Sequence, residues 1–176
     1  MLSSFLLAEF QSIATGYKEM NNVLLNYPVD LFLSKNVCPG RMLFILNGNE
    51  SDILEINKYF KSKKISSIYI LNIHEEIIEK INTTKKPTNI SSFMICEFKN
   101  SICAMKVSDL CVKEANIELV KLEFRIGLFG KSISVFNGLL SNLQSSKTAI
   151  LNNLPNNDIV AIEIIENPVG EIIKCI

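Results

Sequence analysis

Apolar residues follow two different periods along the first half of the chain, and each period predicts a kind of element. Short apolar or alternating runs predict four strands, at Phe5–Phe10, Val29–Leu33, Met42–Leu46 and Ile68–Leu71. Spacings of three and four residues predict a helix after the first strand, with an apolar face of Ile13, Tyr17, Met20 and Leu24. A second helix is expected over Ile53–Phe60, with Asn49 or Ser51 as its N-cap.

The same order of elements returns in the second half of the chain. Residues 3–10, SSFLLAEF, are echoed by residues 91–98, SSFMICEF, at an offset of 88 that holds as far as residues 29–31 and 117–119. After two extra residues in the second copy, Gly40-Arg41 matches Gly130-Lys131, and Asn47-Gly48 matches Asn137-Gly138. This ordered series of matches indicates a tandem duplication.

The duplicated order is strand, helix, strand, strand, helix, strand, which is the ferredoxin-like pattern. The later elements of the second copy are expected at Ile117–Phe124, Ile133–Phe136, Leu139–Leu151 and Ile159–Ile165. We therefore predict an α+β fold of two tandem lobes, each an antiparallel sheet with helices on one face. The first domain is expected at residues 1–84, a polar linker at 85–90 and the second domain at 91–176.

Charge and composition narrow the class of partner. The 18 basic and 18 acidic residues are spread along the chain without a basic block, so we expect no nucleic-acid partner. No apolar run approaches the roughly 18 residues that span a bilayer, and the first residues lack the features of a secretion signal. We therefore expect a cytoplasmic protein without a membrane partner, whose five cysteines are reduced.

The ordered motifs resemble the bacterial microcompartment (BMC) shell domain. Each copy has a first strand with a glutamate near its end, a helix, a strand containing Asp-Leu or Glu-Leu, a Gly-Arg or Gly-Lys turn, and Asn-Gly. The resemblance covers about residues 3–168, and the tandem arrangement is similar to the trimer-forming shell proteins. It implies a pseudo-hexameric homotrimer that contacts neighbouring shell proteins. Residues 34–41, SKNVCPGR, resemble the iron–sulfur-binding shell proteins of propanediol-utilisation compartments.

Cys38 is the candidate metal ligand in this segment. One thiol in a turn is too little to hold a cluster, so a free loop cysteine without metal is the alternative. In trimers of the resembled family, this loop lines the opening on the symmetry axis. The resemblance therefore implies one [4Fe–4S] cluster per trimer, bound by three Cys38 thiolates, with one iron needing a non-protein ligand. Val37, Pro39 and Gly40 complete this pore loop.

The matching loop of the second copy contains Gly127, Leu128, Phe129 and Gly130. Its sequence approaches the phosphate-binding pattern G-x-x-x-x-G-K-[ST], but Arg125 stands where the first glycine is required. We expect this segment to be the counterpart of the Cys38 loop, with Leu128 or Phe129 narrowing an opening. The glutamates at positions 9 and 97 recur at the same point of both copies, and we expect them to have a duplicated structural role.

Several residues bear on contacts and on alternative chemistry. Shell proteins have a lysine at the end of the first helix that lines the edge between tiles, and Lys113 matches it, whereas the first copy has Leu25. Residues 166–170, ENPVG, also lack the arginine and histidine that the family has after its last strand. The single histidine, His74, is expected to have a structural role at a helix start. The remaining cysteines show no C-x-x-C pairing and are expected to be small apolar groups: Cys96, Cys103, Cys111 and Cys175.

We therefore expect a structural shell tile, not an enzyme, because no nucleophile, base and orienting group are visible together. The cluster at Cys38 would serve electron transfer or cluster exchange across the shell. A metal-free pore tile for small polar metabolites is one alternative, and it predicts an open axis without colour. A ligand-binding regulatory protein with paired ferredoxin-like lobes is another, and it predicts a stable monomer or dimer.

Overall fold

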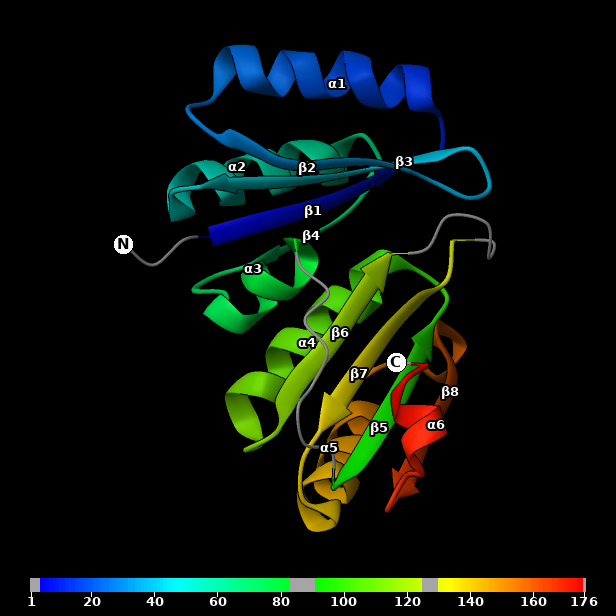
Figure 1. Cartoon of the computed structure of the whole chain (residues 1–176). Coiled ribbons are helices and arrows are strands. Elements are labelled where there is room, and N and C mark those ends of the chain that lie inside the picture. Colours follow the sequence, from blue (N-terminus) through cyan, green and yellow to red (C-terminus); the bar gives the residue numbers. More distant parts are fainter. Residues whose placement is uncertain (1–3, 83–90, 125–129, 176) are drawn as a thin grey trace. The chain divides into compact units, whose positions relative to one another are not determined.

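A computed structural model describes residues 4–82, 91–124 and 130–175 of the chain (Figure 1). These residues form two compact units. The first comprises residues 4–73 together with Gly130, and the second comprises the other described residues from His74 onward. The predicted linker at 85–90 lies outside the described residues. The final helix of the predicted first domain packs within the second unit.

The first unit is built on a four-stranded antiparallel sheet. Its elements, in chain order, are β1 (Ser4–Phe10), α1 (Ile13–Asn26), β2 (Asp30–Val37), β3 (Arg41–Gly48), α2 (Glu50–Ser62) and β4 (Ser66–Ile70). The strands lie in the order β2-β3-β1-β4, and every neighbouring pair is antiparallel. This order confirms the predicted ferredoxin-like topology. Asn49 is the N-cap of α2, and its side-chain oxygen accepts a hydrogen bond from the Asp52 N–H.

The second unit repeats this architecture. Its elements, in chain order, are α3 (Glu75–Asn82), β5 (Ser92–Phe98), α4 (Ser101–Glu114), β6 (Glu118–Phe124), β7 (Ser132–Asn137), α5 (Leu140–Asn153), a 3₁₀ turn (Asn156–Asp158), β8 (Ile159–Glu166) and α6 (Gly170–Ile173). The strands lie in the equivalent order β6-β7-β5-β8 and are again antiparallel. Together, the two sheets confirm the predicted α+β fold with a tandem repeat.

Alternation along the central strands explains which face the helices cover. In the first unit, β1 and β3 contribute every second residue to one cluster with α1 and α2, and its buried members are Leu6, Ala8, Phe10, Met20, Val23, Met42, Phe44, Leu46, Ile53, Ile56 and Phe60. The intervening residues of these strands, Phe5, Leu7, Leu43 and Ile45, are also at most 2% exposed. Both faces of the central strands are therefore apolar, which is why these runs are nearly continuous in the sequence.

The repeated Asn-Gly motif has a packing reason. A Cβ atom at Gly48 would collide with the Val29 side chain, and a Cβ atom at Gly138 would collide with the Ile117 side chain. Val29 and Ile117 each directly precede the second strand of their repeat. The glycine therefore allows this residue to approach the end of the third strand. The same close approach in both units is a further structural mark of the duplication.

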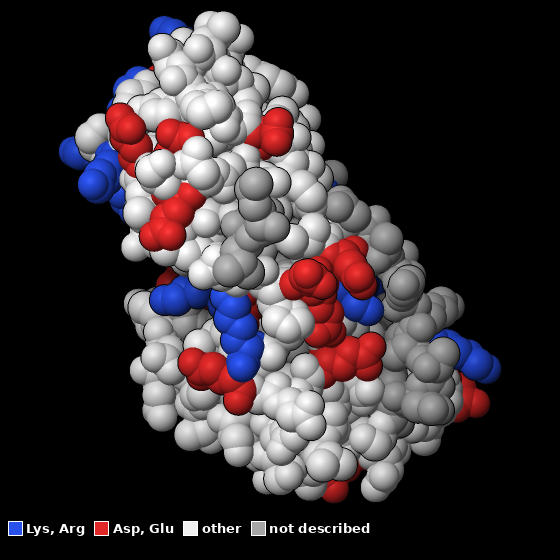
Figure 2. Space-filling model, turned by 90° about the vertical axis from the view of Figure 1, so that its left-hand side faces the viewer, with Lys and Arg blue, Asp and Glu red and all other residues white. Residues whose placement is uncertain are grey.

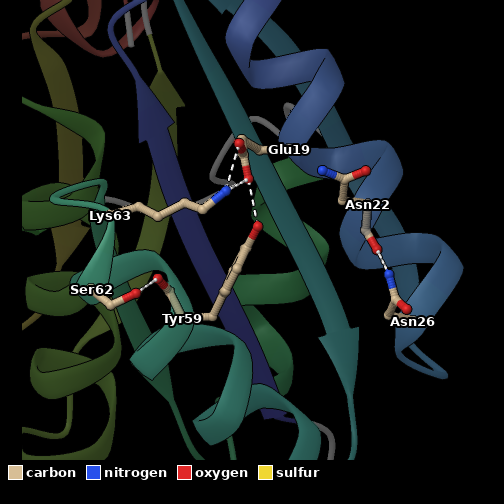
Figure 3. A network of polar contacts seen from close by, with 6 residues as sticks. All are labelled: Glu19, Asn22, Asn26, Tyr59, Ser62 and Lys63. Atoms are coloured by element: carbon tan, nitrogen blue, oxygen red, sulfur yellow. Dashed lines mark hydrogen bonds and ion pairs between the residues drawn. The ribbon is translucent and has the colours of Figure 1, made fainter.

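A polar network joins α1 to the end of α2 in the first unit (Figure 3). The Glu19 carboxylate, whose side chain is only 10% exposed, lies 2.7 Å from Lys63 Nζ and accepts a 2.7 Å hydrogen bond from the Tyr59 hydroxyl. Hydrogen bonds from Lys63 and then Tyr59 hold the pKa of Glu19 below its usual value. The network therefore stabilises the ionised carboxylate between the two helices.

Charge is dispersed over the surface. Basic and acidic side chains are interspersed on the face shown in Figure 2, and uncharged areas separate them. Within the described residues, no helix is long and apolar enough to cross a bilayer.

We expect Tyr59→Phe to lower the free energy of unfolding by about 1 kcal/mol at neutral pH, because it removes one hydrogen bond to a largely buried carboxylate. Urea titration of the two proteins measures the difference. Tyr17→Phe is the matched control, since Tyr17 lies on α1 and is 56% exposed. Equal losses for both variants would contradict a specific role for the Tyr59 hydroxyl.

The same network predicts a pH dependence. Because the native pKa of Glu19 is lowered from 4.5, its ionisation contributes stability above that value, and this contribution is lost as pH falls through the native pKa. Glu19→Gln should therefore destabilise the protein at about pH 7, and its difference from wild type should shrink at about pH 3. A difference that is constant between the two pH values would show that ionisation of Glu19 is irrelevant.

Candidate functional site

The Cys38 turn closes the hairpin formed by β2 and β3. Val37 pairs with Arg41 across the ladder, so Cys38, Pro39 and Gly40 alone make the connection. Gly40 has a φ of 67°, a conformation that favours glycine and that commonly ends three-residue hairpin connections. The pairing of β2 with β3 therefore places Cys38 at the tip of a regular hairpin, where the sequence predicts a loop.

The Cys38 thiol is free and half-buried, whereas Val37 beside it is 4% exposed. A cysteine binds a metal as its thiolate, and the bound metal displaces the thiol proton. Among the described residues of one chain, no group of three or more His, Cys, Asp or Glu side chains is placed to hold a metal ion. Cys38 can therefore take part in a cluster only if other chains supply further ligands.

An ion pair lies directly behind this turn and recurs in the second unit. Arg41 Nη1 is 3.7 Å from Glu9, whose side chain is 5% exposed, and Lys131 Nζ is 2.8 Å from Glu97. The positions are those that match in the repeat, which supports the expected structural role of the two glutamates. Arg41 Nε is buried and has no hydrogen-bond partner among the described residues. An unused donor thus lies three residues after Cys38.

Gly130 brings the second repeat's loop into contact with the Cys38 turn. It belongs to the first compact unit and has a φ of 75°. A Cβ atom at Gly130 would overlap the Cys38 carbonyl oxygen, so only glycine fits against this backbone. Gly127, Leu128 and Phe129 lie outside the described residues, and their place in a pore loop stays a prediction.

The other cysteines have a different character. Cys96, Cys103 and Cys111 are buried, and Cys175 is exposed. Burial, and secondarily the neighbouring Cys111, raises the pKa of Cys96 well above its usual value, while burial raises the pKa of Cys111 to about 12. These two thiols stay protonated at neutral pH and pack as small apolar groups. Cys38 differs from these cysteines because it is half-buried and lies in a turn.

Two predicted residues meet at Asp109 of α4. The carboxylate accepts a hydrogen bond from the backbone N–H of His74 at 3.0 Å, and it binds Lys113 Nζ at 2.6 Å. The His74 imidazole accepts a hydrogen bond from the Glu76 N–H, so the histidine has the expected structural role at a helix start. Lys113, the predicted edge residue, is therefore held by an ion pair within its own helix, while its contact with a neighbouring tile stays a prediction.

Sequence reasoning missed Asp109, and it missed that α3 packs against α4 and β6 of the second unit. Asp109 precedes Lys113 by four residues, which is the spacing of a helical ion pair and was a readable signal. The hydrogen bond from His74 had no such local signal, because its partners are 35 residues apart.

Comparisons with known proteins agree with this architecture. Residues 92–168 match the model of the BMC domain. The bacterial microcompartment shell protein PduT of Citrobacter freundii is 25% identical over 144 residues, which are 80% of this chain and 78% of that protein. The crystal structure of a microcompartment protein from Desulfitobacterium hafniense DCB superposes with a TM-score of 0.84 at 23% identity, covering 99% of this chain and 100% of the other. Residues 92–168 therefore match a BMC domain, and the whole chain has the fold of the Desulfitobacterium hafniense microcompartment protein.

Proposed function

We propose that this chain is a shell protein of a bacterial microcompartment and forms a homotrimeric tile, in which three Cys38 thiolates on the threefold axis hold one [4Fe–4S] cluster. The observation that carries the proposal is the free, half-buried thiol at the tip of the β2–β3 hairpin. Among the described residues of one chain, no group of three ligands is placed around Cys38, so the proposed cluster takes its ligands from a symmetric assembly. Three Cys38 thiolates bind three irons, and the fourth iron takes a non-protein ligand.

The residues around Cys38 fit such a group. Thiolate is the usual protein ligand of iron–sulfur clusters. Arg41 follows the turn directly, and its buried Nε has no hydrogen-bond partner among the described residues. Gly130 lies close against the Cys38 carbonyl, which leaves no room for a side chain at this point.

In this role, the protein forms part of the shell and transfers electrons, and it catalyses no reaction on a substrate. A bound cluster of this kind supplies one-electron transfer. At the centre of a tile, it would pass electrons, or be exchanged as a unit, across the shell wall. Lys113 on α4 would contribute to the edge that meets neighbouring shell proteins.

Anaerobic purification tests the cluster directly. We expect about four iron and four sulfide ions per three chains, with broad absorption near about 400 nm. Cys38→Ser should lose the iron while the trimer persists, because the turn is held by the backbone ladder and not by the thiol. Cys175→Ser is the matched control, since Cys175 is an exposed cysteine elsewhere in the chain, and it should keep the iron.

Two results would count against this function. A trimer free of iron after anaerobic purification would favour the metal-free pore tile. A stable monomer or dimer would contradict the tile itself and favour the regulatory alternative.

Gly130→Ala tests whether the second repeat's loop sets the position of Cys38. The new methyl group would overlap the Cys38 carbonyl, and the positive φ adds a strain of about 1 kcal/mol or more. We expect the variant to lose most of its iron, as measured per trimer. Gly170→Ala is the control, because a Cβ atom there meets nothing within 4 Å. Normal iron content in Gly130→Ala would contradict the proposed coupling of the two loops.

A further inference from the structure

The duplication extends beyond the last strand of each repeat. Residues 72–78 read NIHEEII, and residues 167–173 read NPVGEII, at an offset of 95. The strand registers give the same alignment, because Phe5 pairs with Ile70 and its counterpart Phe93 pairs with Ile165. The short helix α6 therefore corresponds to α3.

The backbone of the two segments is also equivalent. Asn72 and Asn167 both adopt a positive φ, of 51° and 46°. In both segments, the helix begins with the same hydrogen bond of 3.0 Å, from Ile77 N to His74 O and from Ile172 N to Val169 O. The two segments thus leave their last strands in the same way.

The docking of α3 is visible within the second unit. It packs against the edge strand β6 and against α4. The Glu76 carboxylate accepts a hydrogen bond from the backbone N–H of Leu119 on β6, and Asp109 of α4 accepts one from His74 N–H. Ile77 is 0% exposed, and so is Leu119. The helix therefore covers the sheet edge with both a polar and an apolar contact.

The counterpart surface in the first unit is exposed. The edge strand β2 has the same bulge as β6, between Leu31 and Leu33 where β6 has it between Leu119 and Lys121. Leu31, at the place of Leu119, is 42% exposed. Ile172 of α6, at the place of Ile77, is 44% exposed. Within the described residues of one chain, Leu31 of β2 and Ile172 of α6 are thus both exposed, whereas their counterparts Leu119 and Ile77 are buried.

We propose that α6 of one chain docks on β2 and α1 of a second copy, as α3 docks on β6 and α4. Ile172 then packs against Leu31, and the Glu171 carboxylate accepts a hydrogen bond from the Leu31 N–H. Asn21, at the place of Asp109, accepts one from Val169 N–H. Both surfaces are exposed in the single chain, so the contact joins two chains.

The contact is head-to-tail, because each chain supplies a different surface to each neighbour. Repetition of such a contact closes a ring when the rotation permits it. The inference rests on the proposed trimeric tile for the number of chains in the ring. It is independent of the cluster.

The joint between chains also differs chemically from the joint within a chain. Asp109 binds Lys113 within a chain, whereas their counterparts Asn21 and Leu25 are uncharged, and Leu25 is 74% exposed. We expect the contact between chains to depend less on salt than an ion-paired contact would, because screening acts on charged groups and the Asp109–Lys113 pair has no charged counterpart there.

Sedimentation velocity on the full chain tests the docking. Ile172→Glu and Leu31→Glu each place a charge in the contact, and we expect each to weaken trimer formation by roughly 100-fold or more. Leu151→Glu is the matched control, since Leu151 is 45% exposed on α5, and it should remain trimeric. The circular dichroism spectra of Ile172→Glu and Leu31→Glu should match that of Leu151→Glu, which shows that both variants fold.

Mixing the two disrupted variants adds a test of the head-to-tail arrangement. The Leu31→Glu chain keeps its α6 and the Ile172→Glu chain keeps its β2, so an equal mixture should form mixed dimers. A trimeric wild type whose two variants also remain trimeric, or a mixture that stays monomeric, would overturn the docking and leave the proposed function intact. A monomeric wild type would contradict both.

Discussion

An uncovered sheet edge is the constraint on which this structure depends. The edge strand β6 would expose backbone N–H groups and apolar side chains, and α3 covers it through Glu76 and Ile77. The covering helix follows the last strand of the first repeat, so the duplication is also the means by which the second sheet is completed. The same requirement at β2 leaves the first sheet in need of an equivalent helix. In the proposed ring of chains, α6 of a neighbouring chain would cover β2, and the ring would bring together the several thiols that a single Cys38 lacks.

The Cys38 turn shows how the two repeats divide their work. The first repeat provides the thiol on a hairpin tip, and Gly130 of the second repeat provides a surface without a side chain against the Cys38 carbonyl. An ion pair recurs at matching positions of the two repeats, between Glu9 and Arg41 and between Glu97 and Lys131. In each pair, the glutamate lies on the first strand of its repeat. Duplication has therefore preserved the scaffold while the two tips acquired different chemistry.

Much of the fold could be predicted from the sequence because strands and helices each impose a regular spacing on apolar residues that are close in the chain. Alternating runs and helical spacings gave the order of the elements, and the offset of 88 gave the repeat. Contacts between distant residues could not be predicted in this way. Glu19 and Lys63 are 44 residues apart, and the second repeat has Val107 where Glu19 stands, so no repeated pattern indicated the pair. The match between α3 and α6 was readable, but its offset of 95 differs from that of the preceding strands, since the intervening segments differ in length.

The proposed cluster requires a threefold ring that brings three single thiols together into one metal site. A structure of the anaerobically purified assembly, determined by electron cryomicroscopy, tests this claim most directly. We predict three chains around one axis, with density for one cluster bounded by the three Cys38 Sγ atoms. A threefold assembly in which the Cys38 side chains point away from the axis would contradict the claim.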